Sequence, residues 1–345
     1  MHKTFWAYAS ILCCLACSAN AAGLQLLDSD PRLAGAIWYP CAGEPKDVPL
    51  GDLAAIPEIK LTAVKDCPVT GTKLPLVIFS HGRGGWFTMH RDTVEALADA
   101  GFVVAAINHP GDNGTDSSQS DKMSVWASRP TDMVRLLDFM LHDWKDKAVI
   151  DPARIGLFGF SLGAYTGLVL VGANADFGRL ALFCKEGENC ERARSGDVPP
   201  SPRPDARIRA AVLADTAMSF AFTAESLGGI RIPLQIWRSE LGGHGVNATS
   251  TARIASQLPG SPEIHNVPAG HYAFLMPCSP RFAAAVPRVC TDVPEGFDRA
   301  ISTRMWCGSF GSIWLRPRNN VSAPAMMWRT LNSVRLFRAI RLPPA

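Results

Sequence analysis

The amino-acid sequence predicts an α/β fold in which a mostly parallel central sheet is covered by helices on both faces. Two observations lead to this prediction. Short, continuously apolar runs alternate with longer segments whose apolar residues recur at helical spacing, and this alternation is typical of parallel sheets with crossover helices. The 345 residues, of which 47% are hydrophobic, are also enough to bury a large core.

The strands are predicted from runs that lack a polar face. Residues 74–80, LPLVIFS, are apolar almost throughout, which is expected of a strand covered on both sides of a parallel sheet. The other predicted strands are short apolar runs that alternate with the helices, and they cover 34–40, 102–108, 154–160, 207–214, 232–238 and 262–267.

Three helices are predicted between these strands. In 90–101 the apolar residues share one face, and Gly101 ends the segment. Pro130 is expected in the first turn of a helix over 129–141. The N–H groups of the first turn have no acceptor within the helix, so a proline there costs no hydrogen bond. A third helix over 162–175 carries small residues that allow close packing.

Three stretches interrupt the alternation. Residues 24–73 are predicted to be irregular apart from the strand at 34–40, and 110–127 is predicted to be a polar loop. Residues 183–206 are polar and proline-rich, and they predict an inserted loop over the C-terminal edge of the strands. A flap that shapes substrate access would lie there, and a surface loop without function fits the composition equally well.

The first 21 residues predict a secretory signal peptide. A basic start, MHK, precedes an apolar run, and Ala19, Asn20 and Ala21 form a small-x-small cleavage site. The run is too short for an ordinary membrane span. The protein is therefore predicted to be periplasmic or secreted, with no transmembrane anchor. The alternatives are an uncleaved anchor and lipidation at Cys17.

Seven cysteines remain after residue 21, and most should pair in an oxidising compartment. Local spacing suggests Cys41–Cys67, Cys184–Cys190 and Cys278–Cys290 and leaves Cys307 over, although spacing does not fix connectivity. No C-x-x-C pair indicates zinc, and we expect no metal or organic cofactor. The net charge of +3 is too weak to indicate nucleic acid or an anionic membrane surface as a partner, and we expect no nucleic acid partner.

The segment GFSLG at 159–163 places Ser161 between a predicted strand and a predicted helix. This is the pattern of a nucleophile elbow, a turn so tight that Gly159 and Gly163 are needed beside the serine. The turn holds the serine hydroxyl at the carboxyl edge of the sheet. The N–H of Leu162 at the helix start is then predicted to stabilise an oxyanion.

A second Gly-rich turn, HGRGG at 81–85, follows the strand at 74–80. In proteins with a nucleophile elbow this loop gives the other oxyanion donor, and we expect that donor to be the N–H of Arg83. His81 precedes the serine, so it is out of order for the base of a triad and is predicted to brace the loop.

The base is expected after the last strand. His271, in PAGHYAFL, follows the strand at 262–267, whereas His244 lies in a Gly-rich segment and His265 lies inside that strand. His271 is therefore the predicted base.

Two carboxylates are candidates for the acid of the triad. Asp215 ends the strand at 207–214, and Glu240 follows the strand at 232–238. A carboxylate at either position would fix the tautomer of the imidazole and stabilise the imidazolium. Spacing alone does not choose between the two.

Six separated motifs together carry a family resemblance. They are VIFSHGRGG, NHPGD, RPTDMVRLLDFM, GFSLGAYTG, VLADTAMSF and GHYAFL, from about residue 32 to residue 300. The chain resembles the bacterial α/β-hydrolases called predicted dienelactone hydrolases, which are related to the platelet-activating-factor acetylhydrolases. This resemblance implies the α/β-hydrolase fold and Asp215 as the acid, with Glu240 as the alternative. True dienelactone hydrolases use a cysteine nucleophile, whereas this chain has Ser161.

The resemblance implies a serine esterase for short-chain acyl esters, on a phospholipid or similar amphiphile. Its partner would be a small-molecule or lipid ester, bound by one hydrolase domain over 22–300. The alternatives are a lipase, polyesterase or amidase with the same triad, and a secreted scaffold without turnover. Residues 301–345 carry seven arginines and no Asp, Glu or Lys, and we hypothesise that this tail is out of frame with the ancestral gene or replaced.

Overall fold

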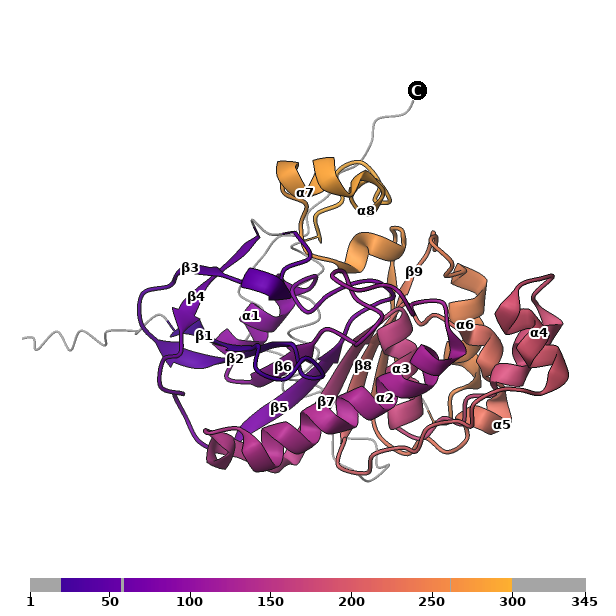
Figure 1. Ribbon diagram of the computed structural model, residues 1–345, viewed down its shortest axis with the longest axis horizontal. Helices are drawn as coiled ribbons and strands as arrows, with labels where there is room; N and C mark the ends of the chain where they lie inside the picture. The colour runs from indigo at the N-terminus through magenta and orange to yellow at the C-terminus, as the bar shows by residue number, and fades with distance from the viewer. Residues whose placement is uncertain (1–19, 57–58, 261, 300–345) are drawn as a thin grey trace, which may run out of the picture. The chain divides into compact units, whose positions relative to one another are not determined.

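A computed structural model of the protein describes residues 20–56, 59–260 and 262–299. Within these ranges lies a ten-stranded sheet in the order β10-β9-β8-β7-β5-β6-β2-β1-β4-β3 (Figure 1). Its strands are β1 (Asn20–Leu27), β2 (Gly35–Ala42), β3 (Lys46–Pro49), β4 (Lys60–Lys65), β5 (Leu74–Ser80), β6 (Val103–Ile107), β7 (Ile150–Phe160), β8 (Ala210–Ala214), β9 (Leu234–Ser239) and β10 (Glu263–Val267).

Six neighbouring strands form the parallel block that the sequence predicts. β10, β9, β8, β7, β5 and β6 all run in the same direction. On the far side, β2 pairs antiparallel with β6 and β1, and β3 pairs antiparallel with β4. Because parallel strands share one carboxyl edge, the loops that follow them bring together residues from distant parts of the chain.

Helices cover both faces of this block. α2 and α3 lie side by side on one face in Figure 1, where α2 contacts β5 and β6, and α3 contacts β5, β7 and β8. α1 contacts β1, β2 and β6. The α-helices are α1 (Arg91–Asp99), α2 (Met123–Asp138), α3 (Leu162–Leu170), α4 (Glu188–Ser195), α5 (Ala224–Leu227), α6 (Ala248–Gln257), α7 (Pro280–Ala285) and α8 (Pro287–Cys290).

The continuous apolar composition of the central strands has a direct structural cause. Along β5, Leu76 and Ile78 join the core on the α2 and α3 face, while Val77 and Phe79 join the core on the α1 face. All four side chains are fully buried. Successive side chains of a strand point to opposite faces, so a strand with a core on each side needs apolar residues at every position.

The N-terminal region is more regular than predicted. β1, β3 and β4 lie in or beside the range 24–73, which was expected to be irregular apart from one strand. In β4 only Leu61 and Ala63 are fully buried, between exposed or half-buried residues. The strands at this end of the sheet are short or polar, so their sequences carry a weak apolar pattern.

The helix predicted over 129–141 begins earlier than expected, inside the predicted polar loop. α2 starts at Met123, so Pro130 lies in the interior of the helix and not in its first turn. A proline removes the N–H that would bond the carbonyl four residues earlier. Here that carbonyl, of Trp126, accepts a hydrogen bond from the Tyr165 hydroxyl at 3.0 Å. α3 therefore supplies the donor that Pro130 lacks.

The three predicted disulfides, Cys41–Cys67, Cys184–Cys190 and Cys278–Cys290, are confirmed. The inserted segment 183–206 contains α4, so it is not a bare loop. The predicted signal peptide lies outside the described residues except for its last two, which pair with β2. Residues 301–345, with Cys307, lie outside them as well. Among the helices that the structure describes, each is too short or too polar to span a bilayer.

Candidate active site

Ser161 lies in the turn between β7 and α3, where the sequence places the elbow. Its backbone has φ 56° and ψ −115°, a conformation that a residue with a side chain rarely adopts. Backbone hydrogen bonds hold it there. Its N–H donates to Ala214 O at 2.8 Å, and its carbonyl accepts from the N–H groups of Ala164, Tyr165 and Ala217 at 3.0, 3.1 and 3.1 Å. The serine is 7% exposed, at the carboxyl end of the parallel block.

The two glycines of the elbow are required by backbone packing. A Cβ at Gly159 would stand 2.3 Å from the carbonyl oxygen of Gly163. A Cβ at Gly163 would stand 1.9 Å from the carbonyl oxygen of Ser80. Both obstructions are main-chain atoms of the sheet and the turn, which cannot rotate away. The two glycines are therefore needed because α3 lies very close to β5 and β7.

His271 and Asp215 reach Ser161 from two other loops at the same edge. The His271 ring Nε2 lies 2.9 Å from Ser161 Oγ, and its Nδ1 lies 2.6 Å from Asp215 Oδ2. His271 follows β10, and Asp215 follows β8. Both side chains are almost fully buried. The residues thus form one hydrogen-bonded chain, Ser161–His271–Asp215, of the kind that transfers a proton from a serine hydroxyl to an imidazole.

A residue that the sequence analysis missed anchors Asp215. Ser239, the last residue of β9, donates its N–H to Asp215 Oδ1 at 3.0 Å and its hydroxyl to Oδ2 at 2.6 Å. The alternative acid, Glu240, is the next residue along the chain, and its side chain is exposed. Only the register between β8 and β9 brings Ser239 beside Asp215, so no local pattern signals it.

The imidazole of His271 is also held by a ring contact. It stacks on Phe160 with ring centroids 4.7 Å apart and an interplanar angle of 27°. The other two histidines that follow the serine in sequence pack elsewhere. His265 stacks on Trp237 within the sheet, and His244 stacks on Tyr272.

The two predicted oxyanion donors lie at the start of α3 and in the loop after β5. Leu162 is the first residue of α3, and the first N–H groups of a helix have no partner within it. Arg83 lies in the HGRGG loop, which Asp112 supports by accepting the Gly84 N–H at 2.8 Å. The loop also closes on itself, since Gly85 N–H donates to Gly82 O at 3.1 Å.

A buried cation fixes the first residue of this loop, and the sequence analysis did not find it. The fully buried guanidinium of Arg129 donates to the His81 carbonyl and to Asp112 Oδ2, the latter at 2.5 Å. Asp112 and Arg129 therefore hold the HGRGG loop at two points, His81 and Gly84. His81 braces the loop as predicted, because its Nε2 accepts the His109 N–H at 3.2 Å.

A second Ser–His–Asp arrangement lies beneath the loop. His109 Nε2 is 2.9 Å from Ser80 Oγ, and its Nδ1 is 3.1 Å from Asp132 Oδ2. Burial lowers the pKa of His109 well below its ordinary value and raises the pKa of Asp132 to about 6. Ser80 and His109 are fully buried, so a substrate cannot reach them. This arrangement satisfies buried polar groups and is not a second nucleophile.

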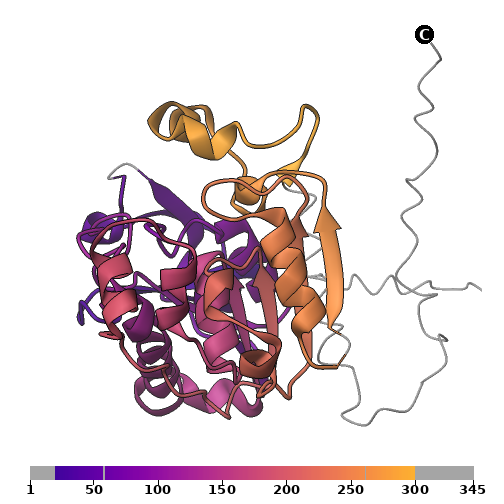
Figure 2. The same ribbon diagram turned by 90° about the vertical axis from the view of Figure 1, so that its right-hand side faces the viewer.

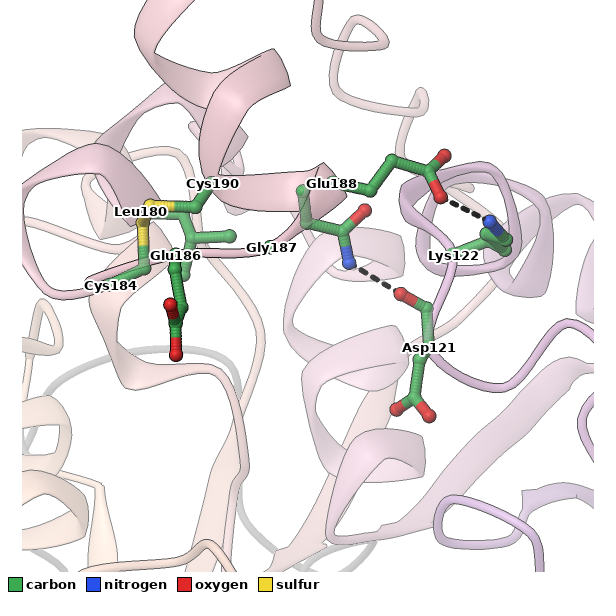
Figure 3. Close-up of a pocket in the computed structure, with 9 residues that line it drawn as sticks. Asp121, Lys122, Leu180, Cys184, Glu186, Gly187, Glu188 and Cys190 are labelled. Atoms are coloured by element: carbon green, nitrogen blue, oxygen red, sulfur yellow. Dashed lines mark hydrogen bonds and ion pairs between the residues drawn. A yellow bond between two sulfur atoms is a disulfide. The ribbon is translucent and has the colours of Figure 1, made fainter.

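The inserted segment borders a hollow of about 270 Å³ beside the start of α2 (Figure 3). Asn189 bonds the Asp121 carbonyl, and Glu188 pairs with Lys122 across it. The Asp121 carboxylate in turn pairs with Arg83 of the HGRGG loop at 2.6 Å. None of the hollow's nine lining residues belongs to the Ser161–His271–Asp215 chain. The described residues contain no group of three His, Cys, Asp or Glu side chains that could hold a metal ion.

Comparisons with known proteins agree with this architecture. The family model of platelet-activating factor acetylhydrolase, isoform II, matches residues 53–124. The lasso peptide isopeptidase AtxE2 of Asticcacaulis excentricus is 32% identical over 106 residues, which are 28% of this chain and 15% of that protein. The chain therefore matches only a small part of this relative's length.

A solved structure matches nearly the whole chain. The ferulic acid esterase of Streptomyces cinnamoneus aligns with a TM-score of 0.58 and 17% identity over 90% of this chain and 95% of its own. With the sheet topology, this likeness confirms the predicted α/β-hydrolase fold. The matches together confirm the resemblance to the acetylhydrolase and dienelactone-hydrolase group.

Proposed function

We propose that this chain, an α/β-hydrolase similar to the platelet-activating-factor acetylhydrolases, is a serine hydrolase that cleaves short-chain carboxylic esters. The observation that carries the proposal is the chain of two hydrogen bonds from Ser161 through His271 to Asp215. Its members come from three loops that follow three different strands. Such convergence at one sheet edge is typical of a catalytic centre in an α/β fold.

The proposed reaction is acyl transfer in two steps. His271 Nε2 takes the proton of the Ser161 hydroxyl as Oγ attacks the ester carbonyl, and the N–H groups of Leu162 and Arg83 stabilise the resulting oxyanion. The C–O bond to the alcohol then breaks, and His271 returns the proton to the leaving oxygen. In the second step His271 takes a proton from water as the water oxygen attacks the acyl carbon. The bond from that carbon to Ser161 Oγ then breaks, His271 returns the proton to Oγ, and the carboxylic acid leaves.

Asp215 has an electrostatic and an orienting role in this scheme. It accepts the Nδ1–H of His271, which leaves Nε2 unprotonated and free to act as the base. Ser239 donates twice to the same carboxylate. These bonds fix the position of the carboxylate beside His271, where its negative charge would stabilise the imidazolium that forms at each proton transfer.

The substrate class rests on the family resemblance and the match over residues 53–124. Both favour an acetyl or other short acyl ester, carried on a phospholipid-like alcohol. The likeness to a lasso peptide isopeptidase supports a second candidate, hydrolysis of an amide bond by the same three residues. The three disulfides fit the predicted periplasmic or secreted location, and we propose residues 22–300 as the hydrolase domain.

One set of assays tests the proposal. p-Nitrophenyl acetate, butyrate and palmitate and an acetyl anilide are compared with wild type and Ser161→Ala. We expect turnover of the acetate to exceed that of the palmitate and to disappear in Ser161→Ala. A fluorophosphonate should label only the wild type. Wild-type turnover by Ser161→Ala would refute the nucleophile, and anilide cleavage faster than acetate cleavage would favour the amidase.

A further inference from the structure

The segment after His271, residues 276–299, returns to the loop that carries this histidine. Figure 2 shows α7 and α8, which belong to this segment, beyond the arrowhead of β10. We infer that Asp292 is a positioning residue for His271. This inference rests on the proposed function, in which His271 is the base.

Asp292 bonds the backbone on both sides of the histidine. Its main-chain carbonyl accepts the Gly270 N–H at 2.9 Å, and its carboxylate Oδ2 accepts the Tyr272 N–H. The N–H of His271 itself donates to the Gly242 carbonyl at 2.9 Å. All three consecutive N–H groups around the imidazole are thus held by other loops, and one residue holds two of them.

The approach of Asp292 explains the glycine that precedes the histidine. A Cβ at Gly270 would stand 2.3 Å from the Asp292 carbonyl oxygen. The backbone of Gly270, with φ −80° and ψ −179°, is one that any residue adopts. The need for glycine therefore comes from the contact with Asp292 and not from the turn itself.

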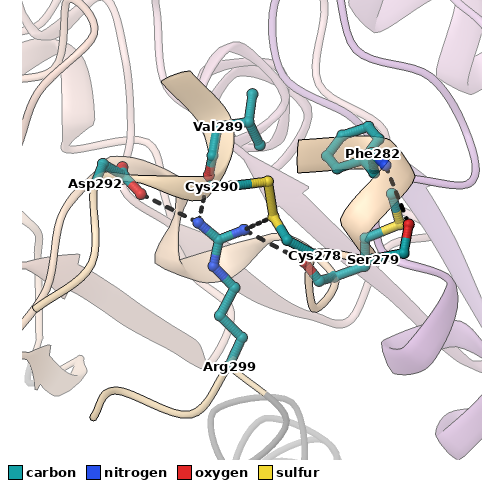
Figure 4. The surroundings of a disulfide bond; sticks show 8 residues. Cys278, Ser279, Phe282, Val289, Cys290, Asp292 and Arg299 are labelled. Carbon is teal, nitrogen blue, oxygen red and sulfur yellow. Dashed lines mark hydrogen bonds and ion pairs between the residues drawn. A yellow bond between two sulfur atoms is a disulfide. The ribbon is translucent and has the colours of Figure 1, made fainter. Parts of the chain in front are cut away.

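Asp292 is in turn fixed by Arg299 and a disulfide (Figure 4). The Arg299 guanidinium pairs with Asp292 Oδ1 at 3.2 Å and donates to the carbonyls of Val289 and Met276. It is 5% exposed. The Cys278–Cys290 bridge closes the same segment two residues before Asp292. A single cation and one covalent link thus hold this segment together around Asp292.

This arrangement matters because the proposed reaction depends on one short contact. The Nε2 of His271 must stay within hydrogen-bonding reach of Ser161 Oγ, 2.9 Å away. Displacement of a reacting group by about 1 Å can cost roughly 10²-fold in rate. Loss of the Tyr272 N–H contact would release one side of the loop and allow such a displacement.

The test compares Asp292→Ala, Asp292→Asn and Glu295→Gln in the full chain, with p-nitrophenyl acetate. We expect Asp292→Ala to lower kcat about 10-fold or more with KM nearly unchanged, and to slow fluorophosphonate labelling equally. Asp292→Asn should restore most of kcat, with the wild-type pH profile, because its amide oxygen can still accept the Tyr272 N–H. Glu295 is an exposed carboxylate of the same segment, so Glu295→Gln should match wild type.

Wild-type kcat in Asp292→Ala, or an equal loss in Asp292→Asn, would overturn the inference. If Asp292→Ala does not fold, Gly270→Ala takes its place, because its methyl group would press on the Asp292 carbonyl. A fall in kcat then supports the inference, and an unchanged kcat overturns it. Ser161→Ala in the same assay separates the proposals. Turnover by that variant refutes the triad, whereas its inactivity beside a fully active Asp292→Ala refutes only the positioning role.

Discussion

Replacement of Asp215 by asparagine tests the role of its carboxylate in the proposed triad. Three donors converge on the carboxylate, namely the N–H of Ser239 on Oδ1, and the Ser239 hydroxyl and His271 Nδ1–H on Oδ2. An asparagine has one oxygen and one NH₂ group for these positions. The peptide N–H of Ser239 cannot become an acceptor, whereas the serine hydroxyl and the imidazole can.

The amide therefore has one favoured orientation. Its oxygen takes the Oδ1 position, and its NH₂ group donates to His271 Nδ1, which leaves the proton on Nε2, where it cannot accept from Ser161. The reverse orientation keeps the active tautomer but leaves the buried Ser239 N–H without an acceptor, at a cost of about 1–3 kcal/mol. That cost leaves at most roughly one molecule in 10 to 10² with the active tautomer. Those molecules also lack the negative charge that stabilises the imidazolium, so the loss of kcat should exceed this factor.

We expect Asp215→Asn to lower kcat for p-nitrophenyl acetate by about 10² to 10⁴-fold, the upper figure being the usual cost of the wrong tautomer. This corresponds to about 3–5 kcal/mol of transition-state stabilisation. Because asparagine has the same shape as aspartate, KM and the thermal unfolding midpoint should change little. Stopped assays with active-site titration by a fluorophosphonate give the rate per competent site.

Glu240→Gln provides the matched control, since it makes the same change of carboxylate to amide at the end of the neighbouring strand. It should keep wild-type kcat. If Asp215→Asn stayed within 10-fold of wild type, or if Glu240→Gln lost as much activity, the assignment of Asp215 as the acid would be wrong.

Two further predictions concern one fully buried ion pair and one half-buried carboxylate. Arg129→Met should destabilise the protein by about 3–5 kcal/mol in urea unfolding, because it leaves the fully buried Asp112 carboxylate without its cation. Arg32→Met, which breaks a pair on an exposed arginine, should cost far less, and equal losses would contradict this reasoning. Burial raises the pKa of Glu95 to about 7, above its value in the unfolded chain. The charge therefore opposes folding at pH 8, and this penalty disappears as the pH falls through 7 toward 4.5. Glu95→Gln should raise the unfolding free energy by about 1–3 kcal/mol at pH 8 and by little at pH 4. A gain that did not depend on pH would refute the electrostatic cause.

Much of the fold could be predicted because its elements obey local rules. The predicted strand at 74–80 coincides with β5, since a strand buried on both faces must be apolar throughout. The elbow is equally local, because the glycines beside Ser161 are dictated by atoms within and directly beneath the turn. The disulfide pairs were also the cysteines nearest in sequence.

The predictions were wrong where the structure depends on contacts that the local sequence pattern does not show. Pro130 looks like the first turn of a helix, yet α2 continues through it because Tyr165, on another helix, bonds the carbonyl that the proline leaves free. β3 and β4 were missed because strands at this end of the sheet bury few side chains. In each case a short stretch of sequence contains the residue but not the distant residues that pack against it.

The sequence by itself determined the α/β class, the position of Ser161 in its turn, and the order along the chain of Ser161, the two candidate carboxylates and His271. These features depend on apolar periodicity and on backbone geometry within a few residues. Only the tertiary structure decided that Asp215 and not Glu240 contacts His271, that Ser239 anchors this carboxylate, and that Asp292 holds the histidine loop. Those contacts join residues 20 to 56 positions apart. They are set by strand register and loop packing, which no short stretch of sequence contains.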